Sequence, residues 1–480
     1  MKPVPIPFPL STAPGVRGQE SSGRVINAYA EPLGKGAPSG VVYRRAPGLQ
    51  NWGTCTASGF RGAIKINSTL FAAYQDKLVY FGSAGGTATN VGTLAGDAKG
   101  FFASNNAATP DMVFCDPDGN ISTFTSGTVT GSYPDPDLPS VTSCCSIDGY
   151  FIFGAANGKM WASGLNTTSV LPTACATAEF KPDPIYRVIN YSNTLIALGS
   201  QTTEFWQDVG STPFPFQRAQ AVNFGIAGPY CVAGQEDGFG AGLVIVANDN
   251  TVRQLNGYTF DKISPPDLDG LIEDEPDKSL IECSVYMSRG HPFLLVQTSG
   301  TASWSWVYDL NTGKWSERNS YLAARSRITG GISAFGKWLC GDTNSGNVLQ
   351  ITKSAYNEVG QPLRWRIESG AVENFPVGMR VGRADFNFVT GVGVSSGTDP
   401  IQTDPTVEIS WSDDGGQNWY PPQQRKIGRQ SQTAGLISLV ASTGRSSWNG
   451  RRWRLDVADP VYVGFMGGTQ NTNPRVSDFG

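Results

Sequence analysis

Residues 409–419, with the sequence ISWSDDGGQNW, form the stretch that decides the fold class of this chain. Two strand-like runs flank a turn of two aspartates and two glycines, the residues that positive-φ positions of a hairpin turn favour. Within it, Ser412, Asp414, Gly416 and Trp419 have the spacing S-x-D-x-G-x-x-W of an Asp-box. In such a turn the carboxylate accepts backbone N–H groups and the Trp packs against the next strand. The motif predicts β structure and, by itself, no chemistry.

The composition indicates the same fold class for the whole chain. Of 480 residues, 58 are Gly and 31 are Pro, and only 16% are charged. Such a turn-rich, charge-poor chain is expected where many short strands are joined by tight turns. No stretch sustains the i, i+3, i+4, i+7 apolar periodicity of an amphipathic helix. We therefore predict an all-β protein.

Charge, cysteines and hydropathy limit the possible environments and partners. A formal net charge of −4 does not favour electrostatic binding of nucleic acid by the chain as a whole. A slightly acidic surface would suit a channel through which DNA slides, and it would suit many ordinary proteins equally. The eight cysteines form no C-x-x-C pair, which favours buried thiols and assembly in a reducing cytoplasm. No run of about 18 apolar residues exists, so we predict no membrane insertion.

Weakly similar units recur along the middle of the chain. Each is an apolar strand, a Gly/Asn/Asp turn and a second strand, at intervals of about 40–50 residues, the period of propeller blades. In the clearest unit, residues 306–315, hydrophobic residues precede Asp-x-Asn-x-Gly and a Trp follows. We predict a β-propeller over residues 45–355, with six blades as the best estimate and seven possible. A pair of β-sandwiches is the alternative.

The two ends of the chain differ from this pattern. Residues 1–10 alternate Pro with apolar residues, which predicts an extended, polyproline-like arm rather than a signal peptide. We assign residues 1–44 to this extended N-terminal arm. Residues 356–480 have longer expected strands, the Asp-box hairpin and an Arg/Trp-rich end. They predict a separate C-terminal β-sandwich-like domain.

Patterns that carry catalysis or cofactor binding are weak. His291 precedes a Pro, and the chain has no G-x-S-x-G elbow, so a structural loop histidine is favoured over a catalytic base. A single histidine and scattered cysteines also exclude a zinc site built from these residues. Residues 331–338 match G-x-x-x-x-G-K but carry Trp338 where a nucleotide-binding loop needs Ser or Thr. The acidic run over 267–277 could hold calcium, but a solvated loop is favoured. We predict no cofactor and no metal.

Two sugar-directed hypotheses stand as alternatives. A sialidase-like glycoside hydrolase needs an arginine triad and a Tyr–Glu nucleophile, and such enzymes usually repeat the Asp-box on several blades. This chain has one box and no Arg-Ile-Pro motif near the N-terminus. A monomeric glycan-binding propeller would instead present a shallow, aromatic-lined pocket.

One stretch near the C-terminus combines basic and aromatic residues. Its arginines Arg451, Arg452 and Arg454 are candidates for contact with DNA phosphates or with an acidic partner protein. The equally weighted alternative is a sheet face on which the arginines pair with Asp456 and Asp459.

Several segments, taken in order, carry a resemblance to a known family. Near the start are residues 25–32 (VINAYAEP) and 43–49 (YRRAPGL), and in the middle are residues 195–206 (LIALGSQTTEFW) and 225–231 (GIAGPYC). The Asp-box hairpin and residues 450–455 (GRRWRL) follow at the end. Together they resemble the packaged-DNA stabilisation proteins, the tail hub or nozzle proteins, of short-tailed bacteriophages.

This resemblance implies a structural virion protein and not an enzyme. Such a protein would assemble as a homohexameric ring below the portal and its adaptor, the head-to-tail connector protein. The ring would continue the channel for packaged double-stranded DNA without reading its sequence, and would help to retain that DNA. It would carry a tailspike or tail fibre and be closed by a tail plug or needle. The expected location is the virion tail, after assembly in the host cytoplasm.

Overall fold

The computed structural model describes residues 2–178, 180–440 and 444–474, and almost every regular element in these ranges is a strand. The helical elements there are one short α-helix, α1 (Pro266–Asp274), and two 3-10 turns, Gly18–Glu20 and Lys278–Leu280. The chain divides into two compact units. We call residues 50–303 and 327–351 the propeller unit, and residues 1–49, 304–326 and 352–480 the terminal unit. The all-β expectation is confirmed, and the predicted boundaries at 44/45 and 355/356 stay predictions.

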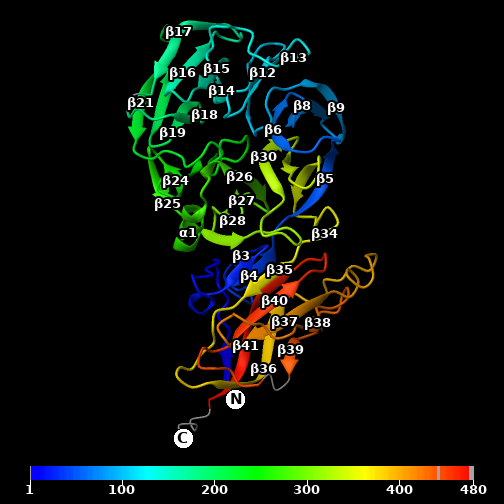
Figure 1. The fold of residues 1–480 in the computed structure, drawn as a ribbon. Coiled ribbons are helices and arrows are strands. Elements are labelled where there is room, and N and C mark those ends of the chain that lie inside the picture. The colour runs from blue at the N-terminus through cyan, green and yellow to red at the C-terminus, as the bar shows by residue number, and fades with distance from the viewer. Residues whose placement is uncertain (1, 179, 441–443, 475–480) are drawn as a thin grey trace. The chain divides into compact units, whose positions relative to one another are not determined.

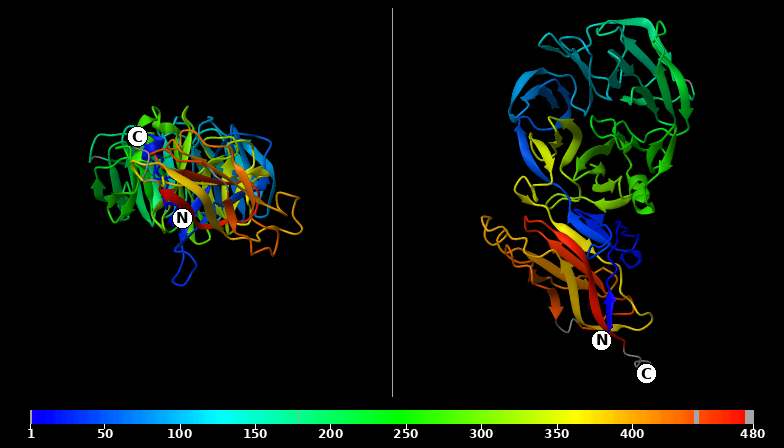
Figure 2. Two further views of the ribbon diagram at one scale, coloured as in Figure 1. Left: turned by 90° about the horizontal axis from the view of Figure 1, so that it is seen from below. Right: turned by 180° about the vertical axis from the view of Figure 1, so that it is seen from behind.

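The propeller unit is built of successive groups of antiparallel strands, which Figure 1 shows following one another from blue through green to yellow, and Figure 2 shows from behind. Five groups have four strands each. The first two are β6 (Phe60–Ile66), β7 (Thr69–Tyr74), β8 (Lys77–Gly82) and β9 (Gly85–Thr93), and then β10 (Phe101–Ser104), β11 (Met112–Cys115), β12 (Ile121–Thr125) and β13 (Thr128–Thr130). The next three are β14 (Ser143–Ile147), β15 (Tyr150–Gly154), β16 (Lys159–Ser163) and β17 (Val170–Thr177); β18 (Ile185–Tyr191), β19 (Thr194–Gly199), β20 (Thr203–Asp208) and β21 (Phe216–Val222); and β22 (Val232–Ala233), β23 (Val244–Val246), β24 (Val252–Asn256) and β25 (Thr259–Lys262). Two further groups are β26 (Ile281–Ser288) with β27 (His291–Thr298), and β30 (Ile328–Ala334) with β31 (Lys337–Asp342) and β32 (Val348–Thr352). Six blades was the best estimate from the sequence. The described residues of this unit contain seven groups, which matches the seven blades that the sequence analysis gave as possible.

Two-residue turns of matching chemistry connect many of these strands. Asp148 and Gly149 have φ values of 51° and 85° and join β14 to β15, as a type I′ hairpin requires. Phe335 and Gly336, with φ values of 55° and 70°, join β30 to β31 in the same way. The G-x-x-x-x-G-K match therefore lies in a hairpin, and no helix follows it, as the sequence suggested.

The terminal unit contains two sheets around one core. The first has the order β3 (Ala28–Pro32), β4 (Val41–Arg45), β41 (Gly464–Pro474), β36 (Met379–Phe388) and β39 (Ile437–Val440), with β1 (Lys2–Pro5) also paired to β41. The second runs β28 (Trp304–Asp309), β29 (Lys314–Glu317), β2 (Arg24–Ile26), β35 (Trp365–Glu368), β40 (Arg452–Val457), β37 (Thr406–Ser412) and β38 (Gln423–Lys426). Two short strands, β33 (Asn357–Glu358) and β34 (Gln361–Pro362), complete this unit. The remaining strand, β5 (Gly48–Thr54), begins in this unit and continues into the propeller unit, where its residues Gly53 and Thr54 pair with β9.

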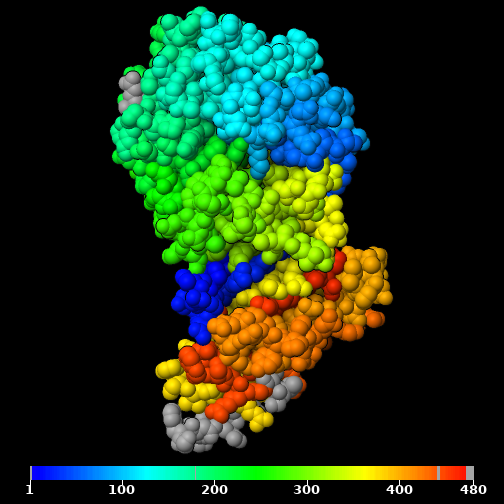
Figure 3. Space-filling model, viewed as in Figure 1, coloured from blue at the N-terminus to red at the C-terminus, as the bar shows by residue number. Residues whose placement is uncertain are grey.

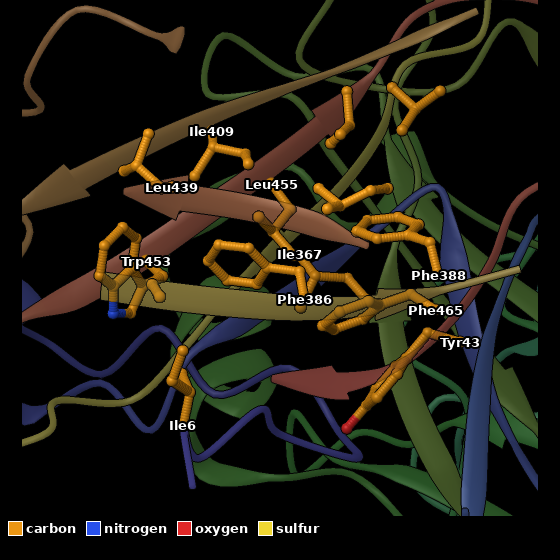
Figure 4. Close-up of a cluster of buried hydrophobic side chains, with 14 of the residues drawn as sticks. Ile6, Tyr43, Ile367, Phe386, Phe388, Ile409, Leu439, Trp453, Leu455 and Phe465 are labelled. Atoms are coloured by element: carbon orange, nitrogen blue, oxygen red, sulfur yellow. The ribbon is translucent and has the colours of Figure 1, made fainter. Parts of the chain in front are cut away.

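Alternating side chains of the two sheets meet in a common core, shown in Figure 4. Phe386 and Phe465 come from the first sheet, and Ile409, Trp453 and Leu455 come from the second. Two sheets that bury their inner faces against one another form a β-sandwich. This confirms the predicted sandwich, to which strands from the first 49 residues also contribute.

Candidate functional site

The first strand of every group in the propeller unit lines one polar cavity of about 530 Å³, which we call the axial cavity. Innermost strands of a propeller surround its axis, so residues from all seven groups reach this space. One lining residue from each of these strands, in chain order, is Arg61, Phe101, Cys145, Arg187, Val232, Glu282 and Thr329.

One ion pair in the axial cavity joins distant parts of the chain. Lys99 Nζ lies 2.5 Å from Glu282 Oε2, and Glu282 is only 7% exposed. Glu282 also accepts hydrogen bonds from the Thr329 hydroxyl at 3.1 Å and the Gly330 N–H at 2.5 Å. Burial acts to raise the pKa of Glu282, but Lys99 and these donors outweigh it and lower the pKa. The carboxylate is therefore ionised, and it is held by Lys99, which precedes β10, and by residues of β30.

Two further charged residues, Arg187 and Glu236, also line the axial cavity. The Arg187 guanidinium lies 3.7 Å from the centre of the Phe101 ring, and burial lowers the pKa of Arg187 to about 10. Burial raises the pKa of Glu236 to about 7, although the Gly234 N–H donates to its carboxylate at 2.7 Å and the Arg187 charge opposes the rise. Glu236 therefore changes charge near neutral pH.

Arg61 is bound on all sides. It donates to the carbonyls of Gln75, Ala95, Gly96 and Ala98, and its Nη2 lies 3.0 Å from Asp116 Oδ2. The side chains of Arg61 and Asp116 are 2% and 0% exposed. This network ties β6 to the end of β11, in the next group of strands.

The arrangement supports ion pairing and proton uptake rather than nucleophilic chemistry. Burial raises the pKa of Cys145, and it raises the pKa of Cys231 to about 12, so these thiols are not activated. Among the described residues, no group of three His, Cys, Asp or Glu side chains is placed to hold a metal ion. His291 begins β27 directly after a turn and stacks on Phe293. Residues 267–274 of the acidic run lie in α1, so this part of the run is helical and the expected loop is wrong there.

The Asp-box hairpin of the terminal unit has the hydrogen bonds that its sequence motif predicts. Asp414 accepts from the N–H groups of Gln417 and Asn418 at 3.0 Å, and the Ser412 hydroxyl donates to it at 2.7 Å. The Gly416 N–H donates to the Ser412 hydroxyl at 2.9 Å, and Trp419 Nε1 donates to the Gly416 carbonyl at 3.1 Å. Burial acts to raise the pKa of Asp414, but these bonds outweigh it and lower that pKa.

The three candidate contact arginines lie beside this hairpin and differ in exposure. Arg451 is fully buried and makes a two-pronged ion pair with Asp413, with both N–O distances 2.8 Å. Arg452 is 4% exposed and donates to the backbone carbonyl of Ser21. Arg454 is one-fifth exposed, pairs with Glu368 at 2.8 Å and lies 3.8 Å from the Trp419 ring centre.

This geometry resembles the alternative of an ion-paired sheet face, but the acidic partners of the arginines are Asp413 and Glu368. The expected partner Asp456 pairs instead with Arg366 at 2.7 Å, and the carboxylate of Asp459 accepts a hydrogen bond from the Thr406 N–H at 2.8 Å. Contact of the three arginines with DNA or protein stays a prediction, and Arg454 is the most exposed of them.

Sequence reasoning did not find the axial cavity or its charges. Lys99 and Glu282 are 183 residues apart, so no local pattern connects them. A signal was present nonetheless: a single charged residue, Arg187 or Glu282, interrupts an otherwise neutral first strand in β18 and β26, and β6 carries Arg61 together with Lys65. A charge buried in an inner strand needs an ionic or hydrogen-bonding partner.

The fold and the paired charges at its axis define a β-propeller protein. The family described as "Bacteriophage P22 Gp10, beta-propeller" matches residues 24–356. This chain therefore belongs to that family of structural phage proteins that stabilise packaged DNA, and the resemblance noted in the sequence is confirmed.

The other comparisons add little. No curated protein matches the chain. Among solved structures, the crystal structure of RRP9 WD40 repeats has 10% sequence identity and a TM-score of 0.41, and the match covers 64% of this chain and 99% of that chain. In the described part of the chain, no helix combines the length and apolarity that crossing a bilayer requires.

Proposed function

We propose that this protein is the tail hub, or nozzle, of a short-tailed phage virion. In this role, copies of the chain form a hexameric ring on the portal adaptor, continue the DNA channel and hold the tailspike or fibre and the plug. The observation that carries the proposal is the family match over residues 24–356, which includes the whole propeller unit.

The distribution of charge supports this proposal. The propeller unit has 14 Lys and Arg against 24 Asp and Glu, a net charge of −10, and the terminal unit has 22 against 16, a net charge of +6. An acidic surface repels DNA phosphates, so DNA can move past it without being retained by counterion release. A basic unit and an acidic unit in the same chain also give neighbouring copies surfaces of opposite sign.

The sialidase alternative finds little support at the axis. Arg61 and Arg187 are the arginines among the described lining residues of the axial cavity. Arg61 is engaged by four carbonyls and Asp116, and Arg187 is stacked on Phe101. A substrate carboxylate would need guanidinium groups whose N–H donors face open space.

The proposal is tested by the mass of the purified protein in solution, alone and with a portal–adaptor complex. We expect a six-fold mass, or a ring that forms only on the adaptor. A monomer that ignores the adaptor would refute the tail-hub role. Cleavage of a fluorogenic sialoside would favour the hydrolase, and saturable binding of a glycan by the monomer would favour the sugar-binding module.

A further inference from the structure

The first residues of the chain are a strand whose two faces have different chemistry. Val4, Ile6 and Phe8 pack on the core of the terminal unit, and Ile6 is only 5% exposed. Pro3, Pro5 and Pro7, which alternate with them, are exposed. In Figure 4, Ile6 points toward the cluster that contains Trp453 and Phe386.

The backbone of residues 2–6 pairs with one strand, β41. β1 pairs antiparallel with residues 469–472 of β41, and the Ile6 N–H donates to the Gly468 carbonyl at 2.9 Å. Because backbone N–H groups alternate in direction along a strand, the even residues face β41 and the odd residues face the open edge. Proline has no N–H, so the prolines at odd positions remove the donors of that edge. The alternating prolines therefore leave this strand with N–H donors on the side of β41 only.

The terminal unit is shaped to receive this segment. Phe8 meets Phe465 edge-to-face with ring centres 4.7 Å apart, and the Tyr43 hydroxyl donates to the Phe8 carbonyl at 3.0 Å. The Gly370 N–H donates to the Pro7 carbonyl at 2.8 Å. Gly23, with φ +122°, leaves room for Pro9, because a Cβ there would lie 2.7 Å from the ring of that proline. Apolar side chains in pockets, with backbone bonds along one edge, are the features of strand addition to a sheet.

The segment is joined to the rest of the chain at a single exposed point. Leu10 is 42% exposed, and beyond it Ser11 and Thr12 are fixed to Trp315 by hydrogen bonds of 2.9 and 2.8 Å. Every partner named for residues 2–9 is distant in sequence, so an identical neighbouring copy offers the same partners. In Figure 3 the blue atoms, which belong to the first part of the chain, are visible at the surface.

We propose that the groove along β41 is a strand-binding site, and that in the assembled ring it receives residues 2–9 of a neighbouring copy. Exchange of identical segments keeps every contact and changes only the hinge, so its cost is small. The prolines at 5, 7 and 9 keep the released segment extended, which lowers the entropy lost when it binds again. This inference rests on the proposed ring, in which copies are close enough to raise the effective concentration of each segment.

A pair of cysteine variants tests the exchange. Pro5 faces Thr469 across a non-hydrogen-bonded position, where Cβ atoms of antiparallel strands are close enough for a disulfide. P5C and T469C are made separately in the full chain, mixed before ring assembly on the portal–adaptor complex, oxidised mildly and resolved without reductant. Each single variant alone, P5A with T469A, and the wild type, whose cysteines are all free, are the controls. The double variant P5C/T469C reports whether the site itself can close.

The result expected is a covalent dimer in the mixed rings, absent from every control. If the rings form and the double variant closes only within one chain, the exchange is refuted and the ring proposal survives. If no ring forms and the disulfide again closes only within one chain, both are refuted. Ring mass is measured separately by light scattering, so the two failures are distinguishable.

Discussion

The buried pair of Arg61 and Asp116 offers the sharpest test of the axial architecture. In Arg61→Met, the fully buried Asp116 carboxylate loses its cationic partner, which lies 3.0 Å away. Removing one member of a buried pair costs roughly 3–5 kcal/mol. The carbonyls that Arg61 binds are orphaned as well, at about 1 kcal/mol or more for each one that stays dry. We therefore expect Arg61→Met to lower the free energy of unfolding of the propeller unit by at least about 3 kcal/mol.

Asp116→Asn is expected to cost less than Arg61→Met. The asparagine oxygen still accepts from the N–H groups of Asp118 and Asn120, which now donate at 3.1 and 3.0 Å, and Arg61 keeps its carbonyls. The matched control is Lys262→Met, which breaks an exposed ion pair of the same unit, with Asp269 at 2.6 Å. Exposed pairs are worth less than about 1 kcal/mol.

The assay is urea unfolding with native-state hydrogen exchange, because a chain of two units need not unfold in one step. Exchange at the amides of β6 and β11 reports the propeller unit alone. If Arg61→Met stays within about 1 kcal/mol of Lys262→Met, the network does not hold the strands together and the reasoning is wrong.

Three other predictions follow from the charged groups. Glu236 has a pKa of about 7 in the folded protein against 4.5 in the unfolded chain, so the stability it contributes falls as the pH rises from about 4.5 to 7. Glu236→Gln should remove this pH dependence from the melting temperature, and an unchanged pH dependence would contradict the assignment. Asp414→Ala should lower the free energy of unfolding by about 1–2 kcal/mol, because the N–H groups of Gln417 and Asn418 lose their acceptor. Asp414→Asn keeps one oxygen and should recover part of this loss. Both variants are measured by urea titration followed by tryptophan fluorescence. Arg454→Ala should fold and assemble, so genome leakage from its particles would indicate DNA contact. Arg451→Ala should fail to fold, because it leaves the carboxylate of Asp413 half-buried and unpaired. Soluble, correctly folded Arg451→Ala would refute the structural role of Arg451.

The sequence predicted the features that depend on neighbours in the chain. The Asp-box bonds of Ser412 and Asp414 span at most four residues, so the spacing alone determines them. The same holds for the Asp148–Gly149 turn, where both residues need positive φ. Strand groups followed from such turns, and with them the propeller and the sandwich.

Features that join distant segments were beyond sequence reasoning. The alternating prolines predicted an extended arm, and the structure shows Lys2–Pro5 paired with a strand more than 460 residues later in the chain. Arg451 was a candidate for an exposed contact, yet it is buried on Asp413, 38 residues away. A basic run cannot reveal which of its members has a buried acid opposite, because that depends on sheet order.

The positions of the axial pairs explain what the propeller unit gains from charges in its interior. Each pair joins strands of different groups: Arg61 on β6 reaches the end of β11, and Glu282 on β26 reaches both Lys99 before β10 and Thr329 on β30. Apolar contacts between blades tolerate small rotations and slips, since they have no direction, whereas a two-partner carboxylate accepts one geometry. Buried ion pairs add little net stability to a fold, so we infer that these pairs serve to fix the geometry between adjacent blades. In the proposed ring this rigidity would matter, because an error in one propeller would be repeated in every copy.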